Sequence, residues 1–389
     1  PEQAANAKTD ITSDKIRKAS QLPRASPNYL LPSLLLMSLR PIARSTWRLR
    51  VPRRHYAIPS KPPPFPTTPT CPNPTCTCSA MPELPPQLSI DYKTALNGTM
   101  APYAEQVLIC TGQEDWASKI EEENSGDNLA ADLKELIGRG GMYADPYHNI
   151  SVANSSFPST VAGREEIQNS SAYLFPSFKY IPFLPRVSFD AVQALVQGYL
   201  LPTKLNPAHD NLSPIHKDRL RRKEEAKAML YGVQDVKDVL VLICGHGGRD
   251  ARCGVIGPVL KQDFERLLEK QDIGIRNGPV VVKGPREYEE RMVLREEEEE
   301  VRQSGDTARV GLISHIGGHK FAGNVILYIP PGMRMADGKE NPLAGCGIWY
   351  GRVEPKHVEG IVKETVLGGR VIEDLFRGGI KQGGEILRL

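Results

Sequence analysis

The chain has 389 residues, of which 40% are hydrophobic and 24% charged, and its net charge is only +3. This is the composition of a globular protein rather than a disordered one, and the length predicts two domains with tails. Seven cysteines, an odd number scattered along the sequence, argue against a disulfide framework and favour metal or redox chemistry.

An N-terminal extension is predicted over 1–58. No Asp or Glu occurs from Met37 to Met81, and arginines crowd the first part of this stretch, between Arg40 and Arg54. An arginine-rich, acid-free amphipathic segment is typical of a mitochondrial presequence. We therefore expect a mitochondrial protein, in the matrix or the intermembrane space, with Met37 where an initiator should be. A basic tail or nuclear signal is the alternative.

One apolar stretch precedes these arginines, from Tyr29 to Leu39. It is too short to span a membrane, and Pro32 interrupts it. A secretory signal is a weaker interpretation, because no basic region followed by a small-residue cleavage site is evident. The sequence thus predicts a soluble protein without membrane insertion.

A proline-rich linker is predicted over 59–86, where eleven prolines indicate an extended, poorly packed chain. Within it lie three thiols in eight residues, Cys71, Cys76 and Cys78. They could bind metal, form a redox-active disulfide or decorate a flexible segment. No histidine or fourth cysteine is near enough in sequence to complete a zinc site.

The segment 87–202 is predicted to be an N-terminal α/β domain, because strand and helix patterns alternate along it. The predicted elements are a strand at 104–111, a charged helical run up to Leu136, a strand at 150–153, an apolar aromatic stretch at 173–184 and a helix at 189–200. Cys110 ends the first strand and is interpreted as a buried free thiol. The segment contains no GxSxG, HExxH or P-loop motif.

A charged helical linker is predicted over 203–236, with one helix from His216 to Val233. Its basic run from Arg219 to Lys223 is interpreted as a solvated helix face. Nucleic-acid binding would need a broader basic surface with stacking aromatic residues, so none is expected.

The second domain is predicted over 237–389. Its expected elements are a strand at 239–243, a helix at 257–270, an acidic insertion at 271–309 containing Glu296–Glu300, strands at 310–314, 324–329 and 348–353, and closing helices within 354–376. This alternation again predicts an α/β fold.

Four residues of types that commonly bind metals lie in two glycine-rich loops of this domain. Cys244 and Cys253 bracket the first loop, and His315 and His319 stand in the second, HIGGH, with three residues between them. Thiolate and neutral imidazole are ligands of zinc and of mixed-ligand 2Fe-2S clusters, and Cys2His2 satisfies either. No metal at all is the third alternative. The paired glycines of HIGGH disfavour a regular helix and predict a tight turn.

The glycines of the cysteine loop, Gly245, Gly247 and Gly248, are expected to turn the backbone and aim amide hydrogens at bridging sulfides. Replacing two thiolates of a cluster by imidazoles removes two negative charges, which raises the reduction potential by several hundred millivolts. Because imidazoles titrate, the potential should also depend on pH.

The segment from Val239 to about Arg370 resembles the thioredoxin-like 2Fe-2S ferredoxins of the sucrase/ferredoxin-like family. The resemblance rests on the HGGRD loop at His246–Asp250 and the GGHKFAGN loop at Gly317–Asn324. It implies two thioredoxin-like α/β domains, the second binding a 2Fe-2S cluster through Cys244, Cys253, His315 and His319. In mitochondrial members, thiols outside the cluster serve redox quality control, and the counterparts here would be Cys71, Cys76 and Cys78.

Residues beside the ligands are expected to tune the site: His246 and Gly245 next to the cluster, and Arg249, Arg252 and Lys320 as positive charges that favour the reduced cluster or dock an acidic partner. The expected function is electron transfer to a redox protein partner, or redox regulation, rather than turnover of a small molecule. The alternatives are a thiol-disulfide oxidoreductase using the N-terminal cysteines and a zinc-stabilised interaction protein. The sequence does not reveal the oligomeric state.

Overall fold

The computed structural model describes residues 63–123, 128–161, 168–282 and 303–389. The predicted N-terminal extension and presequence, and the acidic run Glu296–Glu300, lie outside the described residues. The described residues form one compact unit. None of the helices in the described part of the chain combines the length and apolar character that a membrane crossing requires.

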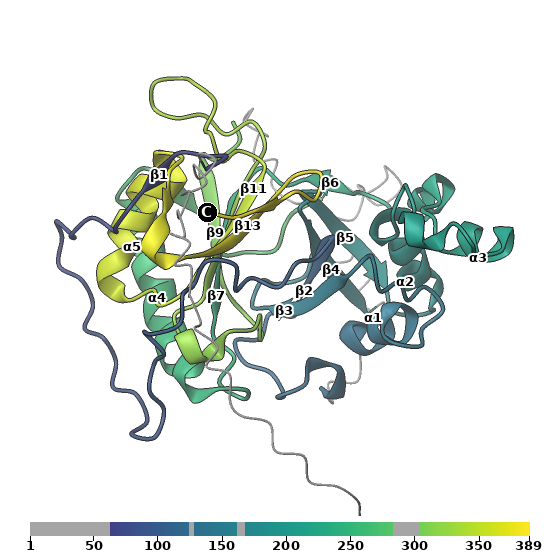
Figure 1. The fold of residues 1–389 in the computed structure, drawn as a ribbon, viewed down its shortest axis with the longest axis horizontal. Coiled ribbons are helices and arrows are strands. Elements are labelled where there is room, and N and C mark those ends of the chain that lie inside the picture. Colours follow the sequence, from purple (N-terminus) through teal and green to yellow (C-terminus); the bar gives the residue numbers. More distant parts are fainter. Residues whose placement is uncertain (1–62, 124–127, 162–167, 283–302) are drawn as a thin grey trace, which may run out of the picture. The chain divides into compact units, whose positions relative to one another are not determined.

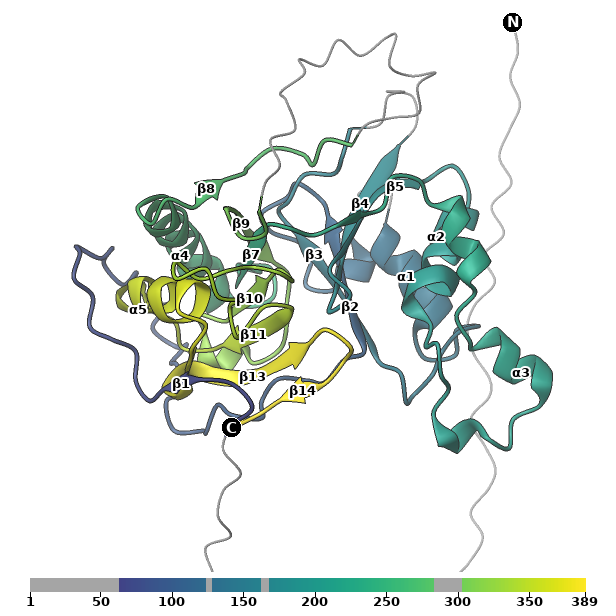
Figure 2. The same ribbon diagram turned by 90° about the horizontal axis from the view of Figure 1, so that it is seen from above.

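Within the described residues, one mixed sheet of twelve strands forms the centre of this unit, and helices lie on both of its sides (Figures 1 and 2). The strands are β1 Thr67–Thr68, β2 Glu105–Cys110, β3 Ile150–Ser155, β4 Asn169–Phe175, β5 Lys179–Pro185, β6 Gln234–Asp235, β7 Val239–Cys244, β8 Gly274–Ile275, β9 Thr307–Ile313, β10 Val325–Ile329, β11 Cys346–Tyr350, β12 Val371–Ile372, β13 Phe376–Lys381 and β14 Ile386–Leu387. Strands β1 and β12 pair outside the large sheet.

The α-helices are α1 Leu129–Ile137, α2 Asp190–Leu195, α3 Pro214–Arg219, α4 Ala251–Glu269 and α5 Pro355–Ile361. Turns of π-helix extend two of them, η2 Val196–Leu200 after α2 and η7 Val362–Leu367 after α5. The 3₁₀ turns are η1 Ile120–Glu122, η3 Pro207–His209, η4 Glu224–Met229, η6 His319–Phe321 and η8 Glu373–Leu375.

The same order of elements occurs twice along the sheet. In the first half, β2 and β3 are parallel and joined through α1, β4 and β5 follow antiparallel, and α2 comes next. In the second half, β7 and β9 are parallel and joined through α4, β10 and β11 follow antiparallel, and α5 comes next. Both opening strands end in the same four residues, VLIC, at Val107–Cys110 and Val241–Cys244. The chain therefore contains an internal structural repeat.

The two halves join edge to edge through β3 and β9, where Ser155 pairs with Ile313. Ser314, the next residue, donates its amide to the carbonyl of Asn154 and accepts the Asn154 amide on its hydroxyl, each at 2.9 Å. The predicted α/β class is confirmed. Because one sheet continues across the predicted linker at 203–236, the division into two separate domains stays a prediction.

The core has three layers of packed side chains. Alternate residues of β7 point to opposite faces. Val241 and Ile243 pack against α4 and α5, whereas Leu240 and Leu242 join a cluster that also contains Leu108 of β2. A third cluster lies between the first half of the sheet and α1 and α2. The cluster that contains Leu240, Leu242 and Leu108 includes residues of both halves of the sheet. In this cluster the ring of Phe175 stacks on the ring of Tyr328, with ring centroids 3.6 Å apart.

The described residues of the predicted linker at 59–86 are mostly exposed or half-buried and irregular, but they contact the second half of the fold at several points. Phe65 is buried and packs edge-on against Phe376, and β1 pairs in parallel with β12. Farther along, Glu359 of α5 accepts hydrogen bonds from the amide and hydroxyl of Thr75 and from the amide of Cys76. Proline predicts extended backbone correctly, but it does not reveal that another part of the chain covers the segment.

One further prediction is wrong, and two features of the sheet were not predicted. The aromatic stretch at 173–184, for which no element was predicted, covers parts of two strands, β4 and β5, with a turn at Pro176 and Ser177. The single charged helix predicted over 216–233 is instead two elements, α3 and the 3₁₀ turn η4. The helix is interrupted between them because the backbone amides of Arg222 and Lys223 donate to the carbonyls of Pro202, just after η2, and of Gln197, within η2. After the closing helices, β13 and β14 were not predicted, since the consecutive glycines of FRGGIK hide the strand pattern.

Candidate metal centre

The two cysteines of the predicted site lie on neighbouring elements. Cys244 is the last residue of β7, and Cys253 lies in the first turn of α4, because that helix begins at Ala251 rather than at Gly257 as predicted. Asp250 caps the helix by accepting the amide of Arg252. The eight residues between the cysteines are therefore a short turn plus a helical turn, and not the flexible loop that the sequence suggested.

Both thiols are buried, at 2% exposure for Cys244 and 1% for Cys253. The pKa of Cys244 lies well below its ordinary value because the Cys253 thiol, the His315 side chain and the His246 amide all donate hydrogen bonds to its sulfur. The pKa of Cys253 is raised, first by that same bond to Cys244 and then by burial. The interaction between the two buried sulfurs thus favours a thiolate at one of them, and the thiolate is the form that binds metal.

The two histidines lie at the seam between the halves of the sheet. His315 follows β9 and Ser314, and His319 opens the 3₁₀ turn η6. Between them Gly317 and Gly318 have φ values of +79° and +73°, which other residues adopt only at a cost. The predicted tight turn is confirmed, and it brings the two imidazole rings to a centroid distance of 5.2 Å.

The four side chains meet as a chain of neighbours. The sulfur of Cys244 contacts both Cys253 and His315, and His315 in turn lies beside His319. His319 is exposed, but partial desolvation lowers its pKa, which favours the neutral imidazole that binds metals. Among the described residues, no group of three or more His, Cys, Asp or Glu side chains converges on a point where a single ion would bind.

The glycines of the cysteine loop have a different role from the predicted one. The amide of Gly245 donates to the carbonyl of Ile313, and the amide of Gly247 donates to the carbonyl of Gly245. The amide of Gly248 donates to the two carboxylate oxygens of Asp115, at 3.0 and 3.1 Å. A Cβ on Gly248 would lie 2.3 Å from the carbonyl of Trp116. These glycines let the loop pack closely against Asp115 and Trp116 of the first half, and it is the His246 amide that donates to sulfur.

Both ring nitrogens of His246 are hydrogen-bonded to other protein groups. It is 1% exposed, and its Nδ1 accepts the backbone N–H of His315 at 2.9 Å. Its Nε2 donates to the carbonyls of Trp116 and Ala117, at 3.1 and 2.9 Å. With both nitrogens bonded, His246 holds the ligand loops in place, as expected for a residue next to the ligands, and has no free nitrogen for a metal.

The three nearby cations differ in availability. Arg252 is buried and makes a bidentate pair with Asp250, and Lys320 pairs with Asp91 at 2.9 Å. Arg249 is exposed, and among the described residues its guanidinium bonds only to Ser118. Of the three charges predicted to face a partner, Arg249 is therefore the one that keeps its charge uncompensated.

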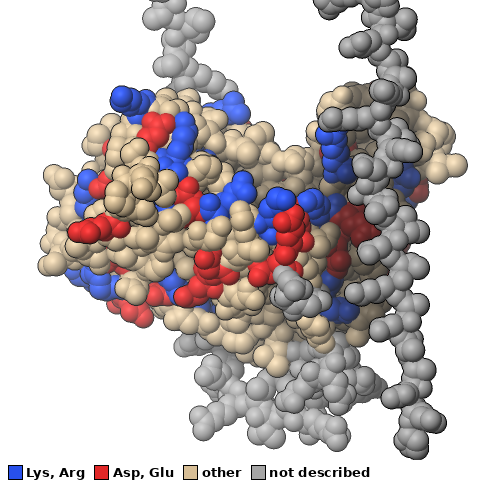
Figure 3. Space-filling model, turned by 90° about the horizontal axis from the view of Figure 1, so that it is seen from below, with Lys and Arg blue, Asp and Glu red and all other residues tan. Residues whose placement is uncertain are grey.

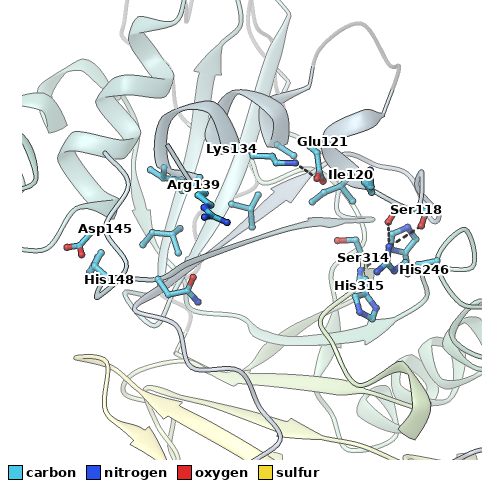
Figure 4. Close-up of a pocket in the computed structure, with 18 residues that line it drawn as sticks. Ser118, Ile120, Glu121, Lys134, Arg139, Asp145, His148, His246, Ser314 and His315 are labelled. Carbon is cyan, nitrogen blue, oxygen red and sulfur yellow. Dashed lines mark hydrogen bonds and ion pairs between the residues drawn. The ribbon is translucent and has the colours of Figure 1, made fainter. Parts of the chain in front are cut away.

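A cavity of about 620 Å³ lies beside the histidine loop, between α1 and the seam of the sheet (Figure 4). His315, Ser314 and His246 lie at one end of it, and Asp145 and His148 lie at the other. Lys134 is neutralised by Glu121, whereas Arg139 has no carboxylate partner in the described residues. The face drawn in Figure 3 carries interleaved bases and acids instead of a field of one sign.

All seven cysteines belong to the described residues, and none forms a disulfide there. Cys71 and Cys76 lie where the predicted linker segment packs on α5, and Cys78 lies where it meets α4. Burial, with the nearby Asp374 and Glu364, raises the pKa of Cys71 to about 12, and burial also raises the pKa of Cys78. A raised pKa makes a thiol a poor nucleophile, so these contacts do not favour the thiol-disulfide alternative.

Residues 96–378 match the family model described as sucrase/ferredoxin-like. Among similar proteins, "Altered inheritance of mitochondria protein 32" of Debaryomyces hansenii is 31% identical over 78% of this chain and 92% of its own length. The proteins of that name from Meyerozyma guilliermondii and Clavispora lusitaniae are 28% and 30% identical, each over 79% of this chain and 94% of their own length. No solved structure matches the chain.

The family model spans both halves of the sheet, from the segment before β2 into β13, and includes all four predicted ligands. The relatives are matched over nearly their whole length, so the similarity covers the complete fold and not only the ligand loops. The chain therefore belongs to the sucrase/ferredoxin-like family and is a homologue of the fungal altered inheritance of mitochondria protein 32.

Proposed function

We propose that this chain is a mitochondrial 2Fe-2S protein that exchanges single electrons with a redox protein, with Cys244, Cys253, His315 and His319 as ligands. The observation that carries the proposal is the placement of the ligands: Cys244 ends β7, Cys253 lies in the first turn of α4, His315 follows β9, which pairs with β7, and the rings of His315 and His319 are 5.2 Å apart. Two soft sulfur donors and two imidazoles form a donor set that suits such a cluster.

The four donors are arranged as two pairs, which is what a cluster of two irons requires. Structural zinc would instead need all four donors around one ion. In a mixed-ligand 2Fe-2S cluster each iron takes only two protein ligands, so the donors must form two pairs. Cys244 with Cys253, and His315 with His319, supply those two pairs from neighbouring elements.

The chain's own residues would control electron exchange by position and exposure. When bound, the cluster supplies a one-electron carrier. The cysteines are buried on the protein side, whereas His319 is exposed and His315 lines the cavity. The imidazole side is therefore the side at which an electron partner would approach. Neutral imidazoles in place of thiolates would keep the potential high.

The mitochondrial assignment is supported by the printed name of the relatives, which refers to inheritance of mitochondria. The repeated order of elements, two parallel strands around a helix followed by an antiparallel pair and a second helix, is consistent with two thioredoxin-like halves. Only the second half has the four ligands. In the first half, Cys110 stands in the place of Cys244, and burial raises its pKa to about 12.

The proposal is tested by assembling the purified protein with iron and sulfide. Visible absorption and a spin-resonance signal after reduction are expected for the wild type, because a 2Fe-2S cluster gives both and zinc gives neither. The double variant His315→Cys, His319→Cys is expected to keep the cluster, with its potential falling toward about −400 mV, the range of all-cysteine ferredoxins. A colourless wild-type protein that contains stoichiometric zinc would contradict the proposal.

We also propose that the electron partner is an acidic protein that docks over the cavity beside His315. Arg139 and Arg249 border this cavity and lack carboxylate partners in the described residues, so they supply its uncompensated charge. Reversing both charges, Arg139→Glu with Arg249→Glu, should slow electron exchange at low salt and leave the cluster spectrum unchanged. Lys339, which is exposed and paired with Asp337, offers the matched control Lys339→Glu. An equal effect of the control would contradict this docking site.

A further inference from the structure

Arg377 of β13 is among the largest side chains that the fold buries completely, with 1% exposure. Burying a cation costs several kcal/mol unless an anion compensates it. Desolvation accordingly lowers the pKa of this guanidinium to about 10. An arginine in this position needs a physical reason.

The partners of Arg377 are all neutral. Its Nε donates to the Thr99 hydroxyl at 3.1 Å and its Nη2 to the Thr99 carbonyl at 3.1 Å. Its Nη1 donates to the carbonyl of Gly317 at 3.2 Å and to the side-chain oxygen of Asn324 at 2.8 Å. In the part of the chain that the structure describes, no Asp or Glu forms an ion pair with it.

The guanidinium connects the two ligand loops. Gly317 lies between the two histidines, and a Cβ on the adjacent Gly318 would be 2.6 Å from Nη2 of Arg377. Asn324 donates its side-chain amide to the Gly318 carbonyl at 3.0 Å, and its own carbonyl accepts the amide of Cys244 at 2.9 Å. Arg377 thus bonds directly to the turn between the two histidines. Through Asn324 it also supports the end of β7, which carries Cys244.

We infer that Arg377 is the built-in counter-charge of the metal centre, holding the histidine turn in position and stabilising the reduced cluster. The inference rests on the proposed function. A cluster of two ferric irons, two sulfides, two thiolates and two neutral imidazoles has no net charge, and one electron from an external reductant makes it a monoanion. A fixed cation in a low-dielectric setting favours that monoanion and so raises the reduction potential.

The experiment is a redox titration of the assembled protein, followed by its visible spectrum, for wild type, Arg377→Gln and Arg377→Lys. The glutamine variant should shift the reduction equilibrium about tenfold toward the oxidised cluster, which is about 59 mV for one electron. The lysine variant, which keeps the charge, should lie between the two. Asn324→Asp places a carboxylate against the guanidinium and should lower the potential as well, which keeps the test available if the glutamine variant does not fold.

Arg309→Gln is the matched control. Arg309 is also a buried arginine, at 3% exposure, but it pairs with Asp238 and lies six residues before His315, roughly 20 Å along the strand. Its loss should lower stability and leave the potential unchanged. An unchanged potential in both Arg377→Gln and Asn324→Asp, or an equal fall in Arg309→Gln, would overturn the inference and leave the proposed function standing. A wild-type protein that takes up no cluster would overturn both.

Discussion

The imidazole of His246 accepts the backbone N–H of His315 at 2.9 Å, and this one bond ties the cysteine loop to the histidine loop. The other nitrogen of the same ring donates to two carbonyls of the first half, those of Trp116 and Ala117. His246 therefore fixes the position of a proposed ligand relative to both halves of the sheet.

Replacing His246 by Ala should lower the free energy of unfolding by about 2–4 kcal/mol, because it leaves a cavity and buried groups without partners. Asparagine, whose side-chain oxygen can take the place of Nδ1, should restore part of that loss and keep the cluster. Chemical denaturation of the protein without metal measures the stability, and the visible spectrum measures cluster retention. His148→Ala, which removes a bond to the Leu200 carbonyl far from the ligands, is the control that should keep the spectrum.

The buried carboxyl of Glu105 is expected to make the stability of the protein depend on pH, independently of any metal. Burial raises the pKa of this carboxyl from 4.5 to about 7, although hydrogen bonds from Ser177 oppose the shift. The folded protein then binds more protons than the unfolded chain between these values. The stabilising contribution is complete below about pH 4.5 and is lost as the pH rises through about 7, by an amount on the order of 3 kcal/mol.

Glu105→Gln should flatten this dependence between pH 5 and 8, as measured by denaturant unfolding at each pH. The exposed Glu83 provides the control Glu83→Gln, which should leave the profile of the wild type unchanged. A wild-type profile that rises over this interval would show that other groups dominate and would contradict the assignment to Glu105.

Local sequence patterns predicted the strands around the site and the turn between the histidines. The apolar run before Cys244 and the paired glycines of HIGGH are short-range signals, and each determines its own element. The start of α4 was missed because Gly254, Gly257 and Pro258 together resemble a loop. In the fold these glycines are needed where the helix touches the cysteine loop, which is a tertiary reason that no local pattern contains.

The contacts that build the site come from distant parts of the chain. Arg377 follows Gly317 by sixty residues, and Trp116 precedes His246 by 130, so neither pairing has a periodic signature. One signal was available: the repeated VLIC at Val107–Cys110 and Val241–Cys244 indicates the internal repeat. Such a repeat predicts the same order of strands in both halves.

The hydrogen bonds of Glu359 lead to a prediction about the solvent accessibility of the N-terminal thiols. It holds the segment around Thr75 and Cys76 on α5, and a salt bridge to Lys363 keeps its pKa low. Glu359→Ala should release this segment and expose Cys71, whose pKa would fall from about 12 toward that of a solvated thiol. Alkylation of Cys71 at pH 8, followed by mass spectrometry, should accelerate at least tenfold, since each unit of pKa changes the thiolate fraction about tenfold.

The exposed Glu340 gives the control Glu340→Ala, which should not alter alkylation. Unchanged alkylation in Glu359→Ala would mean that the prolines and β1 alone hold the segment in place.

Gly257 sets the distance between α4 and the end of β7. A Cβ at this position would lie 2.8 Å from the Cα of Gly245 and 3.0 Å from the carbonyl oxygen of Cys244. In an exposed helix, alanine in place of glycine stabilises by up to about 1 kcal/mol. Here Gly257→Ala should instead destabilise by about 1–3 kcal/mol, because backbone atoms cannot give way as a flexible side chain would.

The same substitution should separate the two cysteines, because the displaced helix carries Cys253 away from Cys244. Cluster retention after assembly should therefore fall together with the midpoint of denaturant unfolding. Gly278→Ala, at an exposed position where a Cβ meets nothing within 4 Å, should change neither quantity. Stability and cluster content equal to wild type in Gly257→Ala would mean that the helix does not need this close approach to hold Cys253 beside Cys244.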